Sequence, residues 1–389
     1  MYKVRTYNKL SSKGLDRFNA ENYDVSSDAV DPDAFMLRSQ KLHDEEIPVS
    51  VKAVARAGAG VNNIPIEKFT EKGIVVFNTP GANANAVKEL IASALFISSR
   101  DIFGGMNYVQ GLTDIKDVGE MSKLLEKQKS QFAGSEVMGK TLGVVGLGAI
   151  GSMVANMALE LGMNVVGFDP AMSVEAAWRL SHKVEKMDNL QSLLAKADFI
   201  TLHVPALDAT KHLINAETLV FMKASAVLLN FAREEVVDSS AVRQALDHKN
   251  LSKYVTDFPT PELLGRKDVI LMPHIGASTE EAEENCAIMA ADQLVDYLEQ
   301  GNIRNSVNFP ATKMPKNSGY RITFCNKNVP KILGSVLSLL ADCSLNVIDM
   351  VNKSRNDVAY NIIDVESEPT QELLNKISNV EGIFSVRLV

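Results

Sequence analysis

The chain of 389 residues lacks the usual marks of a secreted, metal-binding or membrane protein. Its three cysteines, at positions 286, 325 and 343, follow no spacing typical of a disulfide framework or a metal site. No apolar run approaches the roughly 18 residues that a membrane helix needs. The first ten residues, MYKVRTYNKL, have no apolar core of the kind found in signal peptides. These absences predict a reduced, cytoplasmic protein with no metal and no membrane span.

Positive charge is also in short supply. The 40 Lys and Arg residues are outnumbered by 48 Asp and Glu residues, which gives a net charge of −8. Proteins that bind nucleic acids usually carry an excess of basic residues, so this balance argues against that class of partner. The length, with 46% apolar residues, allows a large core and predicts two or three domains.

Residues 141–169, TLGVVGLGAIGSMVANMALELGMNVVGFD, have the pattern of a strand, a tight turn, a helix and a second strand. Gly146, Gly148 and Gly151 would let the backbone turn sharply, approach a pyrophosphate and pack the helix closely on the strand. The helix N-terminus offers unpaired N–H groups and the positive end of its dipole to the phosphates. Asp169 follows the second strand, where a carboxylate accepts the ribose hydroxyls of NAD and repels the extra phosphate of NADP. Glycines alone also serve plain strand-to-helix packing, but the combination predicts an NAD site.

Apolar runs alternate with helical patterns on both sides of this stretch. Before it, runs at 35–37, 51–55 and 74–77 predict a small parallel α/β layer, whereas residues 104–138 are polar and irregular. After it, strands expected at 199–204, 226–230, 254–258 and 269–272 complete a doubly wound sheet. A long helix is expected from the capping-box-like Ser278-x-x-Glu281 to Gly301, followed by a linker at 310–319.

The C-terminal part of the chain changes pattern. Strands are expected at 322–325, 347–351, 359–365 and 384–388, with helices at 330–340 and 373–377. The resulting order βαββαβ is that of the ferredoxin-like split motif.

Four segments together resemble the D-isomer-specific 2-hydroxyacid dehydrogenases, and they occur in that family's order. They are RAGAGVN (56–62), GLGAIG (146–151) with Asp169, NFAREEVVD (230–238) and PHIGAST (273–279). The C-terminal βαββαβ unit is similar to the ACT domain of the family's phosphoglycerate dehydrogenases. The resemblance implies a flavodoxin-like substrate domain (1–96 and 277–312), an inserted Rossmann-type NAD-binding domain (97–276) and an ACT regulatory domain (318–389).

The chemistry of such an enzyme needs an acid/base, a carboxylate that supports it, and a cation for the substrate carboxylate. His274 suits the first role, because the ordinary pKa of histidine, about 6.5, lies near working pH. The resemblance assigns Glu262 to the second role and Arg233 to the third, where a rigid two-pronged donor fits a carboxylate. A histidine satisfied in the interior is the alternative for His274. Two departures from the family pattern are Glu234-Glu235 in place of a glycine pair, and Pro261 before rather than after the acid.

The resemblance also assigns contacts to the cofactor. Ala149 and Ile150 are expected at the pyrophosphate, and Asp257 at the nicotinamide amide. His203, Val204 and Pro205 are expected near the adenine, and Ala232 and Arg233 beside the nicotinamide. Phe231, His274, Gly276 and Ala277 are also expected to bind the cofactor. The place of His203 in the adenine wall argues against a second catalytic histidine.

For the substrate, the resemblance places Arg38 and Arg56, with the loop residues Gly58, Ala59 and Gly60, at a phosphate group. Two guanidinium groups can neutralise a dianion; surface arginines paired with carboxylates are the alternative. The expected reaction is NAD-linked oxidation of 3-phosphoglycerate to 3-phosphohydroxypyruvate, the first step of serine synthesis. Rival interpretations are a hydroxypyruvate or glyoxylate reductase, or a non-catalytic NAD-sensing scaffold or corepressor of the same fold.

Three asparagines in the ACT-like unit, Asn326, Asn328 and Asn346, match positions that hold serine in serine-sensitive relatives. An amide offers both a donor and an acceptor to the charged ends of an amino acid. The match is imperfect, because Asn326 replaces a histidine and Lys331 replaces a glycine. A module that only joins subunits is the alternative, and a homodimer or homotetramer is expected in either case.

Overall fold

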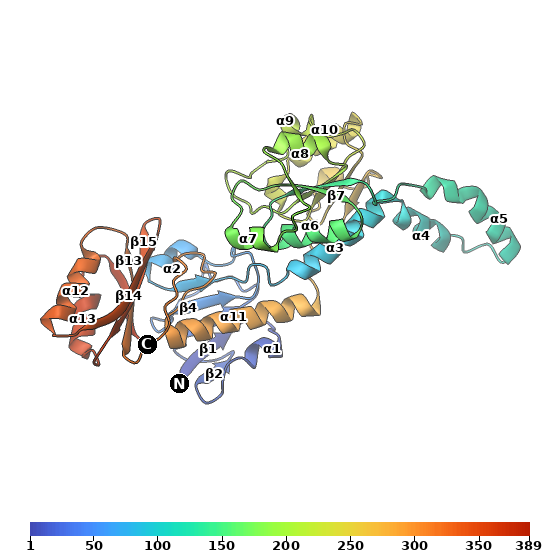
Figure 1. Cartoon of the computed structure of the whole chain (residues 1–389). Coiled ribbons are helices and arrows are strands. Elements are labelled where there is room, and N and C mark those ends of the chain that lie inside the picture. Colours follow the sequence, from blue (N-terminus) through green and yellow to red (C-terminus); the bar gives the residue numbers. More distant parts are fainter. The chain divides into compact units, whose positions relative to one another are not determined.

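The computed structural model describes the backbone of residues 1–389 and every side chain except that of Glu175. The chain forms two compact units, residues 1–83 with 279–389 and residues 84–278 (Figure 1). The domain boundaries implied by the resemblance, at 96/97, 276/277 and 312/318, stay predictions.

A five-stranded parallel sheet lies at the centre of the first unit, in the order β2-β1-β3-β4-β5. The strands are β1 (Tyr2–Thr6), β2 (Tyr23–Ser26), β3 (Ala34–Leu37), β4 (Ala53–Arg56) and β5 (Val75–Phe77), and the helices are α1 (Ser12–Leu15), α2 (Ile66–Glu71) and α11 (Glu280–Gln300). Every residue of β3 and β5 is buried, as parallel sheets covered on both faces require. The strand order 2-1-3-4-5 is the flavodoxin-like order, so this part of the predicted fold class is confirmed.

Helix α11 packs on β3 and β4 along one side of this sheet. Its N-cap is Thr279, whose hydroxyl accepts a hydrogen bond from the Ala282 amide (3.1 Å). The predicted start at Ser278 is therefore wrong by one residue. The helix ends at Gly301 with a φ of +69°, a left-handed conformation that glycine adopts without strain, as expected.

The C-terminal part of the first unit has the predicted βαββαβ order and a four-stranded antiparallel sheet, β14-β15-β13-β16. Its elements are β13 (Tyr320–Lys327), α12 (Ile332–Asp342), β14 (Val347–Arg355), β15 (Val358–Val365), α13 (Gln371–Ser378) and β16 (Ile383–Leu388). One face of the sheet buries Phe324 and Ile363 against Val336 of α12 and Ile377 of α13. This arrangement fits an ACT-like domain.

The other face of the ACT-like sheet binds the C-terminal end of α11, where helix carbonyls lack partners within the helix. Arg387 donates to the carbonyl of Leu298 (3.1 Å), Arg321 to that of Gln300 (2.9 Å), and the Tyr360 hydroxyl to that of Gly301 (2.7 Å). Two arginines also complement the negative end of the helix dipole. The ACT-like sheet therefore acts as the C-terminal cap of α11.

The second unit is built on a seven-stranded parallel sheet in the order β12-β11-β10-β9-β6-β7-β8. The strands are β6 (Thr141–Val145), β7 (Asn164–Phe168), β8 (Glu185–Lys186), β9 (Phe199–Leu202), β10 (Val227–Asn230), β11 (Lys253–Thr256) and β12 (Val269–Leu271). The helices around it are α3 (Ala84–Ser99), α6 (Ala149–Glu160), α7 (Val174–Arg179), α8 (Leu190–Lys196), α9 (Ala216–Leu219) and α10 (Ser239–Asp247). The chain order 3-2-1-4-5-6 within this sheet is the Rossmann order, which confirms the predicted doubly wound domain.

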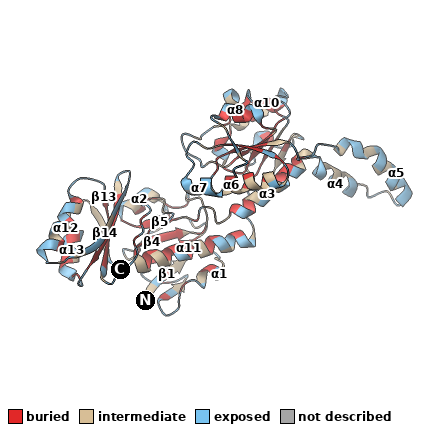
Figure 2. Ribbon diagram, viewed as in Figure 1, coloured by how far each residue is buried: buried red, intermediate tan, exposed pale blue. Residues whose placement is uncertain are grey.

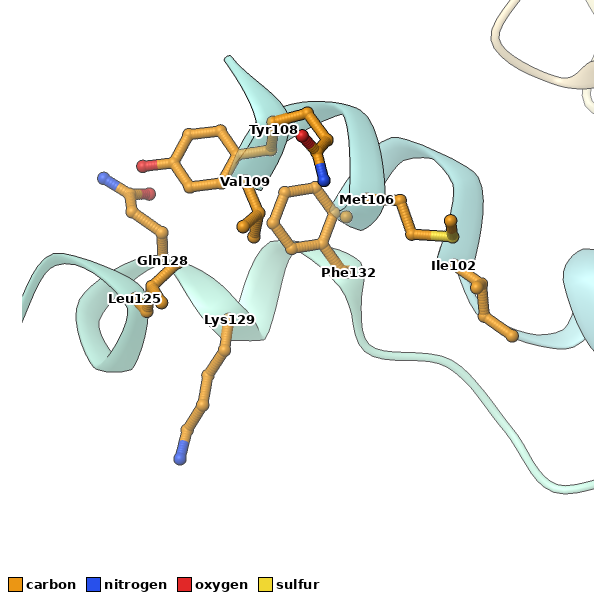
Figure 3. A pocket seen from close by; sticks show the side chains of 10 residues that line it. Ile102, Met106, Tyr108, Val109, Leu125, Gln128, Lys129 and Phe132 are labelled. Atoms are coloured by element: carbon orange, nitrogen blue, oxygen red, sulfur yellow. The ribbon is translucent and has the colours of Figure 1, made fainter. Parts of the chain in front are cut away.

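Residues 104–138 are not irregular throughout, so that prediction is wrong for most of the segment. Helices α4 (Ile102–Gln110) and α5 (Val118–Gln128) and the 3₁₀ helix η1 (Lys129–Phe132) lie there, and Asp101 and Asp117 cap the two α-helices by accepting from backbone amides. Neither α4 nor α5 holds a buried residue among those described (Figure 2). The helices border an apolar groove of about 470 Å³ lined by Ile102, Met106, Tyr108, Val109, Leu125 and Phe132 (Figure 3).

Among the helices formed by the described residues, none combines the length and the apolar character that a membrane crossing demands.

Candidate active site

The predicted glycine turn joins β6 to α6. Gly146 has a φ of +88°, and a Cβ there would lie 2.6 Å from the carbonyl oxygen of His203; a Cβ on Gly151 would lie 1.9 Å from the Gly146 carbonyl oxygen. Both glycines are thus required by close backbone approach. A Cβ on Gly148 would meet no described atom within 4 Å, so packing does not demand glycine at this position.

Gly148 is also the N-cap of α6, and no described side chain caps this helix end. The first turn of α6, which includes Ala149 and Ile150, contains no acidic residue. Its amides are therefore available, with the positive end of the helix dipole behind them, which suits a phosphate. These features fit the pyrophosphate of a dinucleotide.

Asp169 follows β7, and its carboxylate is bound to the glycine turn. Oδ2 accepts from the amide of Leu147 (2.8 Å), between the first two glycines, and Oδ1 accepts from Ala171 (2.9 Å). A carboxylate has about four acceptor positions, so Asp169 retains capacity for ribose hydroxyls. The residue has a structural role, and its role in binding the ribose stays a prediction.

His203 follows β9, and Val204 and Pro205 come next in the chain. Its Nε2 lies 2.9 Å from the hydroxyl of Thr201, and burial lowers the pKa of His203 to about 3. A histidine with that pKa is neutral at physiological pH. This agrees with the prediction that His203 is not a second acid/base.

The turn that carries Phe231, Ala232 and Arg233 is held by the buried side chain of Asn230 at the end of β10. Its Oδ1 accepts from the Ala232 amide (3.1 Å), and its Nδ2 donates to the Arg233 carbonyl (2.9 Å). The half-buried Arg233 guanidinium donates from Nη1 to the Ala232 carbonyl (2.6 Å). The other N–H groups of the guanidinium have no hydrogen-bond partner among the described residues.

Asp257, which directly follows β11, links two further predicted residues in the turn after β12. Its carbonyl accepts from the His274 amide (2.9 Å), and its Oδ2 accepts from the Gly276 amide (3.2 Å). The Asp257 side chain is buried, its Oδ1 has no hydrogen-bond partner among the described residues, and burial raises its pKa. A buried unpaired acceptor is costly, and the N–H donor of a nicotinamide amide would satisfy it. The structure thus fits the nicotinamide as well as the pyrophosphate.

His274 itself is exposed, and the centroid of its ring lies 4.8 Å from that of Phe258. Its φ of +37° lies in the left-handed region, which is sparsely populated by residues other than glycine and asparagine. Such strain is found at sites where function requires a particular side-chain direction.

Glu262 lies in the 3₁₀ helix η3 (Pro261–Leu263) and is exposed. Its carboxylate contacts Arg243 of α10, with 3.6 Å between Oε2 and Nε. No hydrogen bond joins Glu262 to His274 among the described residues. The role of Glu262 beside the histidine stays a prediction.

The predicted phosphate-binding arginines lie in the first unit, at the ends of β3 and β4. Arg56 donates from Nε to the carbonyl of Arg38 (2.9 Å) and from Nη1 to the carbonyl of Gly60, so its guanidinium lies against the loop of Gly58, Ala59 and Gly60. Arg38 contacts Glu283 in the first turn of α11, with 2.7 Å between Nη1 and Oε1. The Arg56 side chain therefore lies against the backbone of Arg38, and the Arg38 guanidinium has a carboxylate partner, as the alternative interpretation of this arginine expects.

Comparison with known proteins agrees with this geometry. Residues 108–276 match the family described as the D-isomer specific 2-hydroxyacid dehydrogenase, NAD binding domain. The chain is 31% identical over 343 residues to the D-3-phosphoglycerate dehydrogenase of Haemophilus influenzae, and the match covers 85% of this chain and 79% of that protein. The chain belongs to the D-isomer-specific 2-hydroxyacid dehydrogenase family.

A second relative from this family is the D-3-phosphoglycerate dehydrogenase of Methanocaldococcus jannaschii, which is 35% identical over 310 residues, or 77% of this chain. The chain spans only about half (55%) of the length of that relative. A crystal structure of NAD⁺-bound 3-phosphoglycerate dehydrogenase from Entamoeba histolytica superimposes with a TM-score of 0.61 at 26% identity, over 79% of this chain and 98% of that one. The cofactor of the family domain is NAD.

The asparagines of the ACT-like domain differ in their surroundings. Asn326 is buried and accepts from Asn361 (2.7 Å), which in turn accepts from Asn352 (2.6 Å), so an amide ladder crosses three strands. Asn328 and Asn346 are exposed, and Asn346 donates to Glu366 (2.8 Å). An effector role for the three predicted residues stays a prediction.

Lys331 is the N-cap of α12 and has a φ of +78°. That left-handed conformation favours glycine, so the lysine at this position carries backbone strain. Compared with the glycine of the family, Lys331 therefore strains the backbone of this loop and adds a positive charge to it.

Two positioning side chains are not predicted from the sequence. Asn230 organises the turn around Arg233, and Asn8 holds the loop after Arg38 by accepting from the amides of Ser39 (3.0 Å) and Gln40 (2.9 Å). In the sequence, an asparagine at or just after the end of a strand can indicate such a side chain, because its amide replaces backbone hydrogen-bond partners in a turn. That signal is too common to select these two residues from the others.

Proposed function

We propose that the chain catalyses NAD-linked oxidation of 3-phosphoglycerate to 3-phosphohydroxypyruvate, the first step of serine synthesis. Family membership and relatives named D-3-phosphoglycerate dehydrogenase support this reaction. The observation that carries the choice of substrate is the position of Arg56 against the backbone of Arg38 at neighbouring strand ends, because two arginines in this region can neutralise a phosphate dianion. An unphosphorylated 2-hydroxy acid has no phosphate for these arginines to bind.

Each candidate residue has a defined task in this reaction. His274 accepts the proton of the substrate C2 hydroxyl, and its ring lies beside that of Phe258. Arg233 donates to the substrate carboxylate from the N–H groups that have no partner among the described residues. When bound, NAD supplies the hydride acceptor.

The cofactor is held by groups that the structure leaves available. The amides of the first turn of α6 bind the pyrophosphate, Asp169 accepts ribose hydroxyls, and Oδ1 of Asp257 accepts from the nicotinamide amide. Oδ2 of Asp257 accepts a hydrogen bond from the Gly276 amide. One side chain therefore orients both the turn after β12 and the nicotinamide.

The experiment is steady-state kinetics of Arg38→Gln and Arg56→Gln with two substrates, 3-phosphoglycerate and D-glycerate. Each charge-assisted contact to the phosphate contributes roughly 1.5–3 kcal/mol, so kcat/KM for 3-phosphoglycerate should fall by about 10- to 150-fold while that for D-glycerate changes little. Arg17→Gln is the matched control, since Arg17 is an exposed arginine paired with Asp292 of α11 (2.6 Å). Equal losses of kcat/KM on both substrates would mean that Arg38 and Arg56 have only structural roles. That result would favour a reductase of unphosphorylated acids.

A further inference from the structure

We propose that Arg243 is a positioning residue for Glu262 and, through that carboxylate, controls the proton affinity of His274. The inference rests on the proposed function, in which His274 is the acid/base, and on the predicted role of Glu262 as its supporting carboxylate. Arg243 has no part in the family motifs quoted above.

Two packed elements bring the charges together. Arg243 lies in the middle of α10, which packs against η3, and the buried Leu263 fixes η3 in the core beside Glu262. The Nε of Arg243 is 3.6 Å from Oε2 of Glu262. This Nε is buried and makes no hydrogen bond among the described residues, so a small movement of the carboxylate would satisfy it.

The other charged groups nearby do not compete for Arg243. Asp247, one turn further along α10, is bound by Arg266 (2.7 Å), which also holds Asp268 (2.8 Å). His274 and Arg233 both act electrostatically on Asp257, and neither Asp257 nor Arg233 forms an ion pair with Arg243 or Glu262 in the described part of the chain. Glu262 is thus the carboxylate that Arg243 engages.

This pairing has a predictable consequence for the histidine. A carboxylate beside an imidazole favours its protonated form, and a cation on that carboxylate opposes this effect. Loss of Arg243 both removes a positive charge and frees Glu262, and the two effects have the same sign. For charges several ångströms apart in a partly solvated site, the protonation midpoint of His274 should move upward by about half a pH unit to one unit.

The test is the pH profile of kcat/KM for oxidation, which rises with pH as His274 loses its proton. Arg243→Gln should move this rise to higher pH by about half a unit to one unit, and Arg243→Lys should move it less. Lys267→Gln, which removes a positive charge from an exposed side chain close in sequence to Glu262, is the matched control and should leave the midpoint in place. Melting temperature and NAD affinity, measured on each variant, show that the fold and the cofactor site persist.

Glu262→Gln separates the inference from the proposed function. If Glu262→Gln lowers the midpoint while Arg243→Gln leaves it unchanged, Glu262 has its proposed role and the inference about Arg243 is overturned. If Glu262→Gln leaves the midpoint unchanged, the proposed role of Glu262 fails, and the role of Arg243 fails with it. The inference is supported if the midpoint of the pH profile moves upward in Arg243→Gln but not in Lys267→Gln or Glu262→Gln.

Discussion

Arg321→Met tests how far one buried arginine stabilises the ACT-like sheet and its contact with the C-terminal end of α11. Arg321 is fully buried and forms two hydrogen bonds with Asp364, from Nε to Oδ1 (2.7 Å) and from Nη2 to Oδ2 (2.8 Å). Its remaining N–H groups donate to the carbonyls of Gln300, Met314 and Pro315 at 2.8–2.9 Å. Methionine fills a similar volume but satisfies none of these acceptors.

The expected loss follows from what the substitution leaves behind. Asp364 is 1% exposed, and its other contact is a long one, 3.4 Å from the Asn317 amide. Removal of one partner from a buried ion pair costs about 3–5 kcal/mol, because the other charge remains buried and unpaired. In a domain of about 150–250 residues each kcal/mol changes Tm by about 2–4 °C, so Tm should fall by about 6–20 °C.

The assay is thermal and urea unfolding of the whole chain, with Arg17→Met as the control. Arg17 forms an exposed ion pair with Asp292, and such pairs contribute about 0–1 kcal/mol. The double variant Arg321→Met/Asp364→Leu should recover much of the loss, because it leaves no buried charge at this pair. A Tm for Arg321→Met within about 2 °C of the Arg17→Met control would refute the reasoning.

Three further predictions concern ligands and pH. Burial raises the pKa of Asp257, so its ionised form destabilises the fold above that pKa. Asp257→Asn should therefore raise Tm at about pH 8, and this gain should shrink toward about pH 4. The same substitution should weaken NAD binding. Asp169→Ala should reduce the preference for NAD over NADP, and an unchanged ratio of kcat/KM values would place the selective acid elsewhere. Serine should give a calorimetric heat with the whole chain and none with an Asn346→Ala variant; no heat with either at millimolar serine would leave the ACT-like domain without this ligand.

Much of the fold and of the cofactor site can be predicted from the sequence, because both depend on local rules. Gly146 and Gly151 are required by backbone contacts that any residue with a Cβ would break, and a turn with this spacing has few other uses. The apolar runs of parallel strands and the period of the C-terminal strands likewise depend on neighbours in the chain. These patterns predict the class of each of the three sheets and most of their strands, but they miss β1 and β2 of the first parallel sheet and β8 of the second.

Features that depend on distant partners cannot be predicted in this way. The Arg243–Glu262 contact and the amide ladder of Asn326 with Asn361 join residues from different elements, and nothing in either local sequence indicates the partner. Helices α4 and α5 bury none of their described residues, although Ile102, Met106 and Val109 recur at helical spacing along α4. The prediction of an irregular segment overlooks this spacing. The capping aspartates of the two helices, Asp101 and Asp117, are a second signal.

The central claim is that a phosphate-bearing 2-hydroxy acid is the substrate, and the most direct measurement is a comparison on the unaltered chain with NAD. The specificity constant kcat/KM is measured for 3-phosphoglycerate and for D-glycerate, which differ only in the phosphate. Two charge-assisted arginine contacts, at roughly 1.5–3 kcal/mol each, predict a preference of about 10²–10⁴ for 3-phosphoglycerate. Equal constants, or a preference for D-glycerate, would contradict the account.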